Sequence, residues 1–443
     1  MGTHRISRRR FLKRTAAAGA GAAATIAAGC DNRRAVRAGS GGVTLDFYNY
    51  SNPEWRYYYT EKLIPAFERK HPGIKVRFNE AFGDRMYDGK LLTLIAGGVA
   101  PDVFHVVQSN YPSYAAKENV LPLDQFIAND PSFSLDDFFP KMADAMRYKG
   151  KLVGLPSDFS TIMMFYNRDA FDRAGIAPPR DDWTWSEYLD IARKLTHDTN
   201  GDGRLDVWGT ANQPVYNRWP AWIWMWGGDV FNSDATRCTM DDPKSIAGFK
   251  FFVDLALKEK VAPRPNMLEL ELFDDRFASQ RTAMIPNSRY MYKRFLKTRK
   301  LPFNWDVAPM PRGPAAQATT FIWGGNCIFR NTKHPRESWE FLKFISGKEG
   351  AEVTVEAGNA LPPYRPAAEA EIAEPRDKNV PKNDRAFLEA ISYGRIAPFP
   401  RQYPEFVSAM TPLHETFVGI GAPEEACVRF ADKVNSFLNS SVF

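Results

Sequence analysis

The segment from residue 162 to residue 195 constrains the fold more than any other part of this chain. It begins with an apolar run, Ile162 to Tyr166, which is typical of a buried strand. A short helical pattern follows and ends at Gly175, and a pair of prolines then breaks the chain. Thr184 and Glu187 have the spacing of a capping box, which predicts that a second, amphipathic helix begins there. The pattern therefore predicts a strand-helix-helix unit of an α/β protein.

The charge of the chain is unevenly distributed. At 443 residues, with 44% of them hydrophobic, the chain is long enough for two or three domains with a sizeable core. The formal net charge of +6 is a first hint of nucleic-acid binding, but the whole excess lies in one basic cluster before Cys30: Arg5, Arg8, Arg9, Arg10, Lys13 and Arg14. The remainder is neutral, so we expect no nucleic-acid partner.

The N-terminus resembles a twin-arginine export signal. Residues 7–13 read SRRRFLK, and a mild stretch rich in Ala and Gly follows from Thr15 to Gly29. This stretch is too short and too weakly apolar to span a membrane, so it indicates an address that a receptor reads. We therefore expect export by the twin-arginine route to the periplasm or the cell surface.

The export signal ends at Cys30, in the sequence IAAGC, which resembles the lipobox of bacterial lipoproteins. Ala27 departs from that pattern, since a large aliphatic residue is usual there. A free thiol at Cys30, or ordinary cleavage after Ala28 or Gly29, remains the alternative. We expect Cys30 to be lipidated and to anchor the protein to a membrane. Residues 31–42 have no apolar period and end in a Gly/Ser run, which predicts a flexible tether.

Three further cysteines, Cys238, Cys327 and Cys427, lie far apart and have no C-x-x-C spacing. They predict no disulfide framework, and we expect buried apolar thiols.

Several blocks of sequence resemble family 1 of the extracellular solute-binding proteins of bacterial ABC importers, the maltose-binding-protein-like group that mostly binds sugars. Their order along the chain matches that family, and the resemblance spans nearly the whole mature chain. The block at residues 281–290 departs from the family pattern AAMxxNGxW, with Ser288 in place of Gly and Tyr290 in place of Trp. The blocks are FERKHPGIKVRF (67–78), IAGGVAPDVFHVV (95–107), YNRDAFDRAGI…WTWSEYLDIARKL (166–195), RTAMIPNSRY (281–290), KHPRESWEFLKFISGKEGAE (333–352) and LPPYR (361–365).

The resemblance implies the α/β, two-lobed periplasmic-binding-protein fold of type II. Each lobe would be a mixed sheet flanked by helices, with a hinged cleft between the lobes. The implied division is a signal with its lipobox (1–30), a tether (31–42), lobe 1 (43–155 with 302–350) and lobe 2 (156–301 with 351–443).

Candidate ligand-binding residues follow from strand ends and from the resemblance. In an open α/β sheet the ligand lies beyond the carboxyl ends of the strands, and aromatic faces with amide and carboxylate groups suit a sugar. Arg289 and Arg365 leave room for an anionic solute. The full set is Asn49, Tyr50, Trp55, Gln108, Ser109, Asp158, Ser160, Trp226, Gly228, Asn287, Arg289, Tyr290, Trp323, Asn326 and Arg365.

One loop has part of a calcium-binding pattern, with oxygen side chains at Asp198, Asn200, Asp202 and Asp206. Gly209 stands where the closing Glu should be, so we expect a polar turn, with weak calcium binding at most, in preference to a tight structural calcium site. No other cofactor is expected.

The function that these features predict is capture of a sugar or oligosaccharide by a monomeric receptor, which delivers it to the transmembrane subunits of an ABC permease. One alternative is a receptor for another polar or anionic solute, such as a glycerophosphate or a uronate. The other is a secreted carbohydrate-active enzyme, which would need a pair of carboxylates drawn from Asp84, Asp158 or Asp229. The chain lacks the H-E-x-x-H, G-x-S-x-G and P-loop spacings, so no catalytic residue is predicted.

Overall fold

The computed structural model describes residues 42–50, 53–81, 84–264, 272–291, 301–358, 360–375 and 381–439. The chain divides into an N-terminal unit, residues 1–43, and a large unit, residues 44–443. The expected export signal, Cys30 and residues 31–41 of the expected tether lie outside the described residues. In the described part of the chain, no helix combines the length and the apolar character that crossing a membrane requires.

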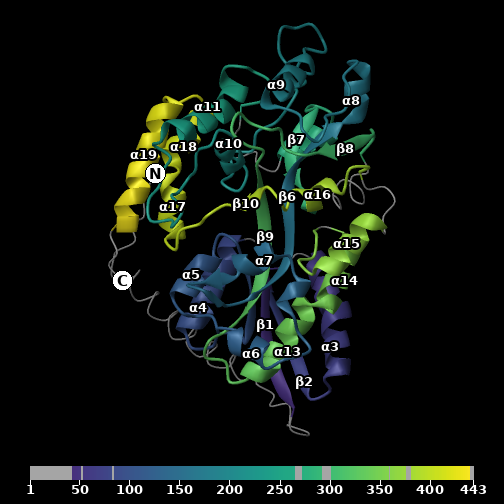
Figure 1. The fold of residues 1–443 in the computed structure, drawn as a ribbon, viewed down its shortest axis with the longest axis vertical. Helices are drawn as coiled ribbons and strands as arrows, with labels where there is room; N and C mark the ends of the chain where they lie inside the picture. Colours follow the sequence, from purple (N-terminus) through teal and green to yellow (C-terminus); the bar gives the residue numbers. More distant parts are fainter. Residues whose placement is uncertain are drawn as a thin grey trace, which may run out of the picture. The chain divides into compact units, whose positions relative to one another are not determined.

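The large unit contains two groups of helices around one extended sheet of eight strands, and β4 and β5 form a separate two-stranded sheet (Figure 1). The strands are β1 (Val43–Tyr50), β2 (Ile74–Ala81), β3 (Val103–Val107), β4 (Arg147–Tyr148), β5 (Lys151–Leu152), β6 (Leu155–Asn167), β7 (Met284–Ser288), β8 (Trp305–Ala308), β9 (Thr319–Ile328) and β10 (Gly394–Ile396). The helices up to β7 are α2 (Pro53–Tyr57), the π-helix η1 (Tyr58–Leu63), α3 (Ile64–Lys70), α4 (Asp84–Ala96), α5 (Tyr111–Ala116), α6 (Asp124–Ala128), the 3-10 helix η2 (Leu135–Asp137), α7 (Pro140–Ala145), α8 (Arg168–Arg173), α9 (Trp185–Lys194), α10 (Pro220–Met225), α11 (Pro243–Leu257) and α12 (Leu272–Ala278). After β7 come the 3-10 helix η4 (Arg289–Met291), α13 (Pro335–Ser346), α14 (Lys348–Ala357), α15 (Arg365–Ala373), α16 (Ala386–Glu389), α17 (Tyr403–Ala409), α18 (Thr411–Phe417) and α19 (Pro423–Asn439).

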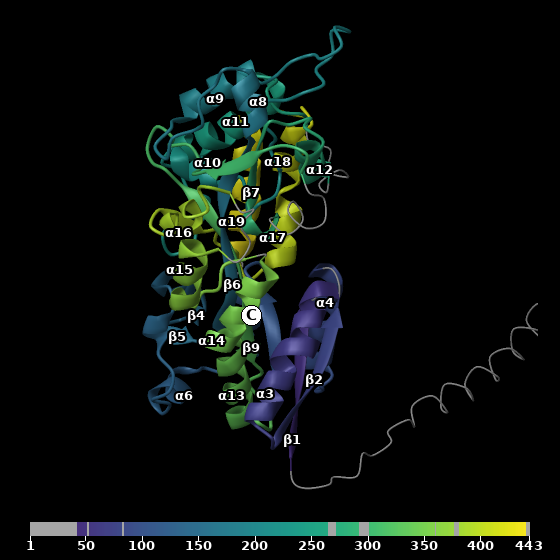
Figure 2. The same cartoon turned by 90° about the vertical axis from the view of Figure 1, so that its right-hand side faces the viewer.

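Two long strands, β6 and β9, connect the two halves of the sheet. The strand order is β2-β1-β3-β9-β6-β7, with β10 beside β9 and β8 beside β6. The first part of β6, Leu155 to Thr161, pairs with β9, whereas the second part, Ile162 to Asn167, pairs with β7 and β8. We call the β1–β3 side the first lobe and the β7–β8 side the second lobe. Figure 2 shows β6 and β9 between them.

Two segments lie in a different lobe from the predicted one. Strand β8 was expected in the first lobe, but it pairs with Met164 to Asn167 of β6 in the second. Helices α14 and α15 were expected in the second lobe. Instead, α14 packs on η1 and α13, and α15 packs on α14. Tyr58 donates a hydrogen bond to the carbonyl oxygen of Glu356, 3.3 Å away, which ties η1 to α14. The lobe boundaries therefore follow strand pairing and helix packing instead of the breaks assumed from sequence.

The strand-helix-helix unit forms largely as its sequence predicts. The backbone N–H of Thr184 donates to Glu187 Oε2 at 2.7 Å, and that of Glu187 donates to Thr184 Oγ1 at 3.3 Å, so the capping box begins α9. Asn167 caps α8 by accepting the backbone N–H of Ala170 at 3.0 Å. The chain turns at Gly175, where φ is +65°, a value that glycine adopts without strain.

The second lobe is built around a cluster of tryptophans. Trp219, Trp222 and Trp224 are buried with residues of α9, α11, α17 and α19. Burying these large aromatic surfaces stabilises the packing of the helices of this lobe. Cys238, Cys327 and Cys427 are buried free thiols, as expected.

Candidate functional site

A cleft of about 320 Å³ lies along the crossing strands β6 and β9. This volume is at the lower end of the range of about 300 to 1,000 Å³ that small-molecule sites occupy. Most of the lining comes from the first lobe and the two crossing strands, while Asn217 and Tyr290 come from the second lobe. The lining residues are Asn49, Trp55, Tyr59, Leu63, His105, Val107, Gln108, Ser109, Ser157, Asp158, Asn217, Tyr290, Ile322, Trp323, Gly324, Ile345, Gly350 and Thr354.

The structure brings seven of the predicted residues together in this lining: Asn49, Trp55, Gln108, Ser109, Asp158, Tyr290 and Trp323. Strand ends explain part of this grouping. Strands β1 and β3 are parallel neighbours, so Asn49 at the end of β1 and Gln108 just after β3 lie at the same edge of the sheet. Their role in binding a solute stays a prediction, and the side chain of Tyr50 lies outside the described part.

An irregularity in β6 accompanies the position of Asp158. The register of β6 against β9 shifts between Pro156 and Asp158, as in a β-bulge, a feature that re-aims side chains near sites. Opposite the bulge, a Cβ on Gly324 would lie 2.7 Å from His105 Cε1 and 2.9 Å from Asp158 Oδ1. Glycine at position 324 therefore allows both side chains to approach the strand closely.

The carboxylate of Asp158 accepts hydrogen bonds from neutral groups. These donors are the hydroxyl of Ser157 (3.3 Å), the hydroxyl of Tyr290 and the backbone N–H of Gly324. Burial outweighs these bonds and raises the pKa of Asp158 to about 6. The cleft therefore contains a carboxyl group that titrates near neutral pH.

His105 and Tyr290 remain uncharged near neutral pH. Burial lowers the pKa of His105 to about 4, and its Nδ1 lies 3.4 Å from Asn326 Oδ1. Burial also raises the pKa of Tyr290 well above its ordinary value, and the nearby charge of Asp158 adds to this effect. Tyr290 thus keeps its proton and can donate it in a hydrogen bond to Asp158.

Three buried polar atoms of lining residues have no hydrogen-bond partner in the described part of the chain. They are two donors, the indole Nε1 of Trp323 and the side-chain nitrogen of Asn49, and one acceptor, the side-chain oxygen of Gln108. Leaving such a group unsatisfied costs about 1 to 3 kcal/mol, so most buried polar groups find a partner in the protein, in water or in a ligand. A ligand that carries hydroxyl groups could satisfy all three atoms.

Aromatic rings form a large part of the lining. Trp55 and Tyr59 approach each other with ring centroids 6.2 Å apart, and Trp323 packs edge-on against Tyr111 at 5.7 Å. Among the lining residues that were not predicted from the sequence are Tyr59, His105, Asn217 and Thr354. The one available signal for Tyr59 was its position four residues after Trp55, which places both rings on the same side of a helical segment. Tyr59 lies in the π-helix η1, a distortion that often marks functional sites.

Arg289 is a correction to the predicted site. It is buried, and its Nε and Nη2 donate to the two carboxylate oxygens of Asp384 at 3.2 and 3.0 Å. Its Nη1 donates to the carbonyl oxygen of Ala360, and Glu371 lies 3.7 Å away. This guanidinium is therefore engaged within the protein and does not line the cleft.

Ser160 and Asn287 also serve the protein's own hydrogen bonding. Ser160 Oγ accepts the backbone N–H of Arg289 at 2.8 Å and is fully buried. Asn287 donates to Asp274 Oδ1 at 2.6 Å, and its side-chain oxygen accepts from Arg218 at 3.2 Å. Both residues lie outside the cleft lining.

Asn326 and Arg365 are two further predicted residues outside the lining. Asn326 is fully buried behind the cleft, beside His105. Arg365 is exposed at the start of α15, where its Nη2 donates to the carbonyl oxygen of Asp136. Neither placement favours contact with a solute in this cleft.

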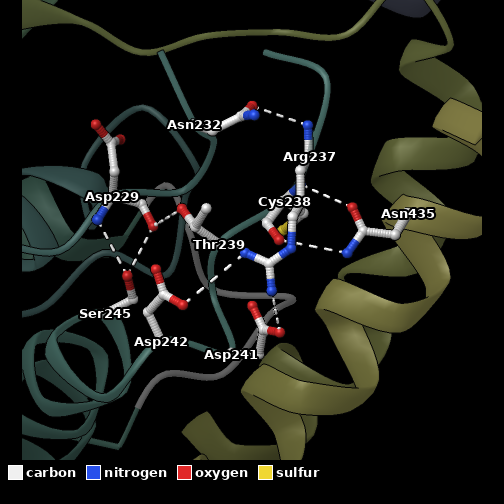
Figure 3. Close-up of polar contacts among 9 residues, drawn as sticks. All are labelled: Asp229, Asn232, Arg237, Cys238, Thr239, Asp241, Asp242, Ser245 and Asn435. Carbon is white, nitrogen blue, oxygen red and sulfur yellow. Dashed lines mark hydrogen bonds and ion pairs between the residues drawn. The ribbon is translucent and has the colours of Figure 1, made fainter. Parts of the chain in front are cut away.

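The glycine turn after α10 is structural as well. Trp226 stacks on Phe251, with ring centroids 4.5 Å apart. A Cβ on Gly228 would lie 2.4 Å from the backbone nitrogen of Ser245, so only glycine fits there. Figure 3 shows the polar contacts that follow, in which the backbone N–H of Asp229 donates to Ser245 Oγ. Trp226 and Gly228 therefore pack the second lobe.

The loop that resembles part of a calcium site satisfies its oxygens internally. Asp198 accepts the backbone N–H groups of Asn200, Gly201 and Gly203 at 3.0, 2.8 and 2.7 Å. Asp206 accepts both the backbone N–H and the hydroxyl of Thr199. Over the described ranges, no group of three or more His, Cys, Asp and Glu residues is arranged to hold a metal ion. The geometry is that of a polar turn, and weak calcium binding stays a prediction.

Two lobes joined by crossing strands, with a polar and aromatic cleft beside those strands, define the class of two-lobed solute-binding proteins. A model of the bacterial extracellular solute-binding proteins matches residues 51–352, and the chain belongs to that family.

Similar proteins cover nearly the whole chain. A putative binding protein from Brucella abortus (strain 2308) is 23% identical over 409 residues, which are 91% of this chain and 95% of that protein. An ABC substrate-binding protein from Listeria monocytogenes, solved in complex with cycloalternan, superposes with a TM-score of 0.78 at 26% identity, covering 90% of this chain and 99% of that one. The GacH receptor of Streptomyces glaucescens, solved without ligand and with acarbose, gives 0.73 at 22% identity over 90% and 99%. These likenesses confirm the predicted two-lobed α/β periplasmic-binding-protein fold.

Proposed function

We propose that this protein captures a sugar or oligosaccharide in the cleft and delivers it to the transmembrane subunits of an ABC importer. The observation that carries the proposal is the pairing of aromatic faces with unsatisfied buried polar atoms in one cleft. Several relatives support it by what they bind, since an arabinooligosaccharide-binding protein of Bacillus subtilis and a maltotriose-binding protein of Pyrococcus abyssi match parts of this chain.

The cleft offers each kind of contact that a sugar uses. Trp55, Tyr59 and Trp323 can cover the apolar face of a ring. The Nε1 of Trp323 can donate to a hydroxyl oxygen, and the side-chain oxygen of Gln108 can accept a hydroxyl proton. Asp158 adds a charged acceptor, which makes stronger hydrogen bonds than a neutral one.

Closure would bring the second lobe onto the sugar. Asn217 and Tyr290 line the cleft from that lobe, and β6 and β9 are the segments about which the lobes would hinge. Enclosing the sugar would remove it from water, and the closed form would be the one presented to the permease.

The two alternatives have less support. The described lining offers no guanidinium or ammonium group to pair with an anionic solute, because Arg289 and Arg365 lie elsewhere. A glycosidase needs two carboxyl groups flanking the bond, and Asp158 is the one carboxylate in that lining. Asp229 is engaged by Trp224 and Arg395, and the side chain of Asp84 lies outside the described part. The family is one of solute-binding proteins, which also favours binding over catalysis.

The cellular setting is part of the proposal. The twin-arginine-like leader and the lipobox-like IAAGC support export and a lipid anchor at Cys30. The protein would act as a monomer outside the cytoplasm, held near its permease by residues 31–42, without a catalytic cofactor.

Binding of defined sugars tests the proposal. Maltotriose, mannotriose and arabinotriose are titrated into the purified protein, which is followed by calorimetry and tryptophan fluorescence. At least one should bind, and Trp323→Ala should weaken it by a factor that corresponds to about 2 to 4 kcal/mol, as for a buried aromatic anchor. Trp226→Ala is the matched control outside the lining. Release of smaller sugars during incubation would favour the enzyme, and unchanged affinity in Trp323→Ala would refute this site.

A further inference from the structure

The charge of the cleft depends on one residue. Among the lining residues in the described part of the chain, Asp158 is the one carboxylate, and none is Lys or Arg. The other titratable side chains of the lining are Tyr59, His105 and Tyr290. Each comes from a different element, namely η1, β3 and η4.

The hydrogen-bond partners of Asp158 leave its charge uncompensated. The groups that bond to it are the hydroxyls of Ser157 and Tyr290 and the backbone N–H of Gly324, all of them neutral. Asp158 is half-buried, and a partly desolvated carboxylate without a cation disfavours a second negative charge nearby and favours neutral donors or a cation.

We propose that Asp158 sets the charge selectivity of the cleft, so that it accepts hydroxyl groups of neutral sugars and excludes sugars that carry a carboxylate or a phosphate. This inference rests on the proposed function, because it defines the class of sugar that the same site takes. An ionised Asp158 can accept a hydroxyl proton, whereas a carboxylate or phosphate oxygen in the same place has no proton to donate and meets a like charge.

The selectivity should depend on pH through Asp158 alone. Burial raises the pKa of Asp158 to about 6, so this group is ionised above that pH and protonated below it. Burial lowers the pKa of His105 to about 4, so His105 stays neutral throughout this interval. Burial raises the pKa values of Tyr59 and Tyr290 far above it, so neither changes charge. Acidification through pH 6 should therefore weaken the exclusion of acidic sugars.

The experiment compares neutral and acidic probes by calorimetry on the full chain. The neutral probes are maltotriose, mannotriose and arabinotriose, and the acidic ones are trigalacturonate, glucuronate and glycerol 3-phosphate. At about pH 7.5 the wild-type protein should bind its best neutral probe at least roughly tenfold more tightly than any acidic one, as a like-charge contact implies. At about pH 5 that ratio should shrink, because Asp158 then carries a proton.

Asp158→Asn separates charge from shape. This variant should weaken the neutral sugar and bring the ratio of neutral to acidic affinities close to one at both pH values. Asp202→Asn makes the same change in a loop outside the lining and should keep the wild-type ratio. Unfolding profiles show whether both variants are folded. If Asp158→Asn is unstable, Asp158→Glu replaces it; this variant keeps the charge and should still bind neutral sugars more tightly than acidic ones.

The possible results separate a failure of the proposed charge selectivity from a failure of the proposed sugar binding. Tighter binding of an acidic probe than of every neutral one would overturn it, and so would an unchanged ratio in Asp158→Asn. Binding of neutral and acidic sugars with equal affinity would overturn the charge selectivity while leaving sugar capture intact. Binding of no sugar of either kind would refute the proposed function and this inference together.

Discussion

Tyr290 and Asp158 line the same cleft, where burial raises the pKa of Asp158 and hydrogen bonding to the Tyr290 hydroxyl lowers it by a smaller amount. Tyr290 belongs to η4, directly after strand β7 of the second lobe, and Asp158 lies at the bulge of the crossing strand β6. This pair therefore brings a residue of the second lobe together with a residue of the strand that both lobes share, inside the cleft that we propose as the sugar site. Changes at these two residues should affect binding and lobe closure together.

Tyr290→Phe removes that hydrogen bond and keeps the ring. We expect sugar affinity to fall by roughly 1.5 to 3 kcal/mol, the range for a hydrogen bond to a charged group. Tyr290→Ala also removes the ring, so its loss should be larger. Calorimetry measures both, with Trp226→Ala as the control. Equal affinities of wild type and Tyr290→Ala would place Tyr290 outside the binding site.

Asp158→Asn should stabilise the ligand-free protein while it weakens binding. The pKa of Asp158 is about 6 in the folded protein and near 3.8 in the unfolded chain, so the folded state binds this proton more tightly. The resulting loss of stability grows as pH rises from 3.8 to 6 and is complete above that interval. Asn removes it, which should add roughly 1 to 3 kcal/mol to the free energy of unfolding at about pH 8. The gain should vanish near pH 4, as urea denaturation at the two pH values would show. An equal gain at both pH values would contradict the assigned cause.

Arg289→Met should destabilise the fold without acting directly on the solute. The buried guanidinium bonds both carboxylate oxygens of Asp384 and lies beside Glu371, so its removal leaves buried negative charge uncompensated. We expect a loss of about 3 to 5 kcal/mol in the free energy of unfolding. Arg365→Met, at an exposed guanidinium, should change it by less than about 1 kcal/mol. If Arg289→Met has wild-type stability but no longer binds the sugar, Arg289 is a ligand-binding residue after all.

Asp198→Ala should lower the melting temperature and leave sugar affinity unchanged. Three backbone N–H groups of the loop lose their acceptor in this variant, whereas Asp202→Ala removes the acceptor of the Arg204 backbone N–H. The effect of Asp198→Ala should therefore exceed that of Asp202→Ala. Melting curves with calcium and with a chelator test whether this loop binds calcium. A large rise in melting temperature with calcium would establish a genuine calcium site.

Cys30→Ser should release the protein from the membrane fraction. The motivation is the IAAGC sequence after the twin-arginine-like leader. Fractionation of cells that express each form, with mass spectrometry of the mature N-terminus, gives the answer. Wild-type protein that is already soluble, with a first residue other than Cys30, would rule out the anchor.

The local elements, and the edge of the sheet where the cleft lies, could be predicted from the amino-acid sequence. The capping box at Thr184 and Glu187, the apolar run within β6 and the turn at Gly175 depend on neighbours a few residues away, so they can be read directly. The positions of Asn49 and Gln108 at that edge could also be predicted, because the carboxyl ends of parallel strands meet at one edge.

Which polar residues line the cleft, and which bond within the protein, depends on packing that local sequence patterns do not report. Arg289 and Asp384 are 95 positions apart, and their pairing depends on how a strand end packs against a distant segment. Tyr59 lines the cleft because η1 turns it there, and α14 joins the first lobe because its side chains meet η1. Periodicity and motifs report short-range order, whereas the partner of a buried charge is decided by packing between segments far apart in sequence. That physical difference explains why the sequence could place Asp158 among the cleft residues, whereas it could not show that Arg289 pairs with Asp384 away from the cleft.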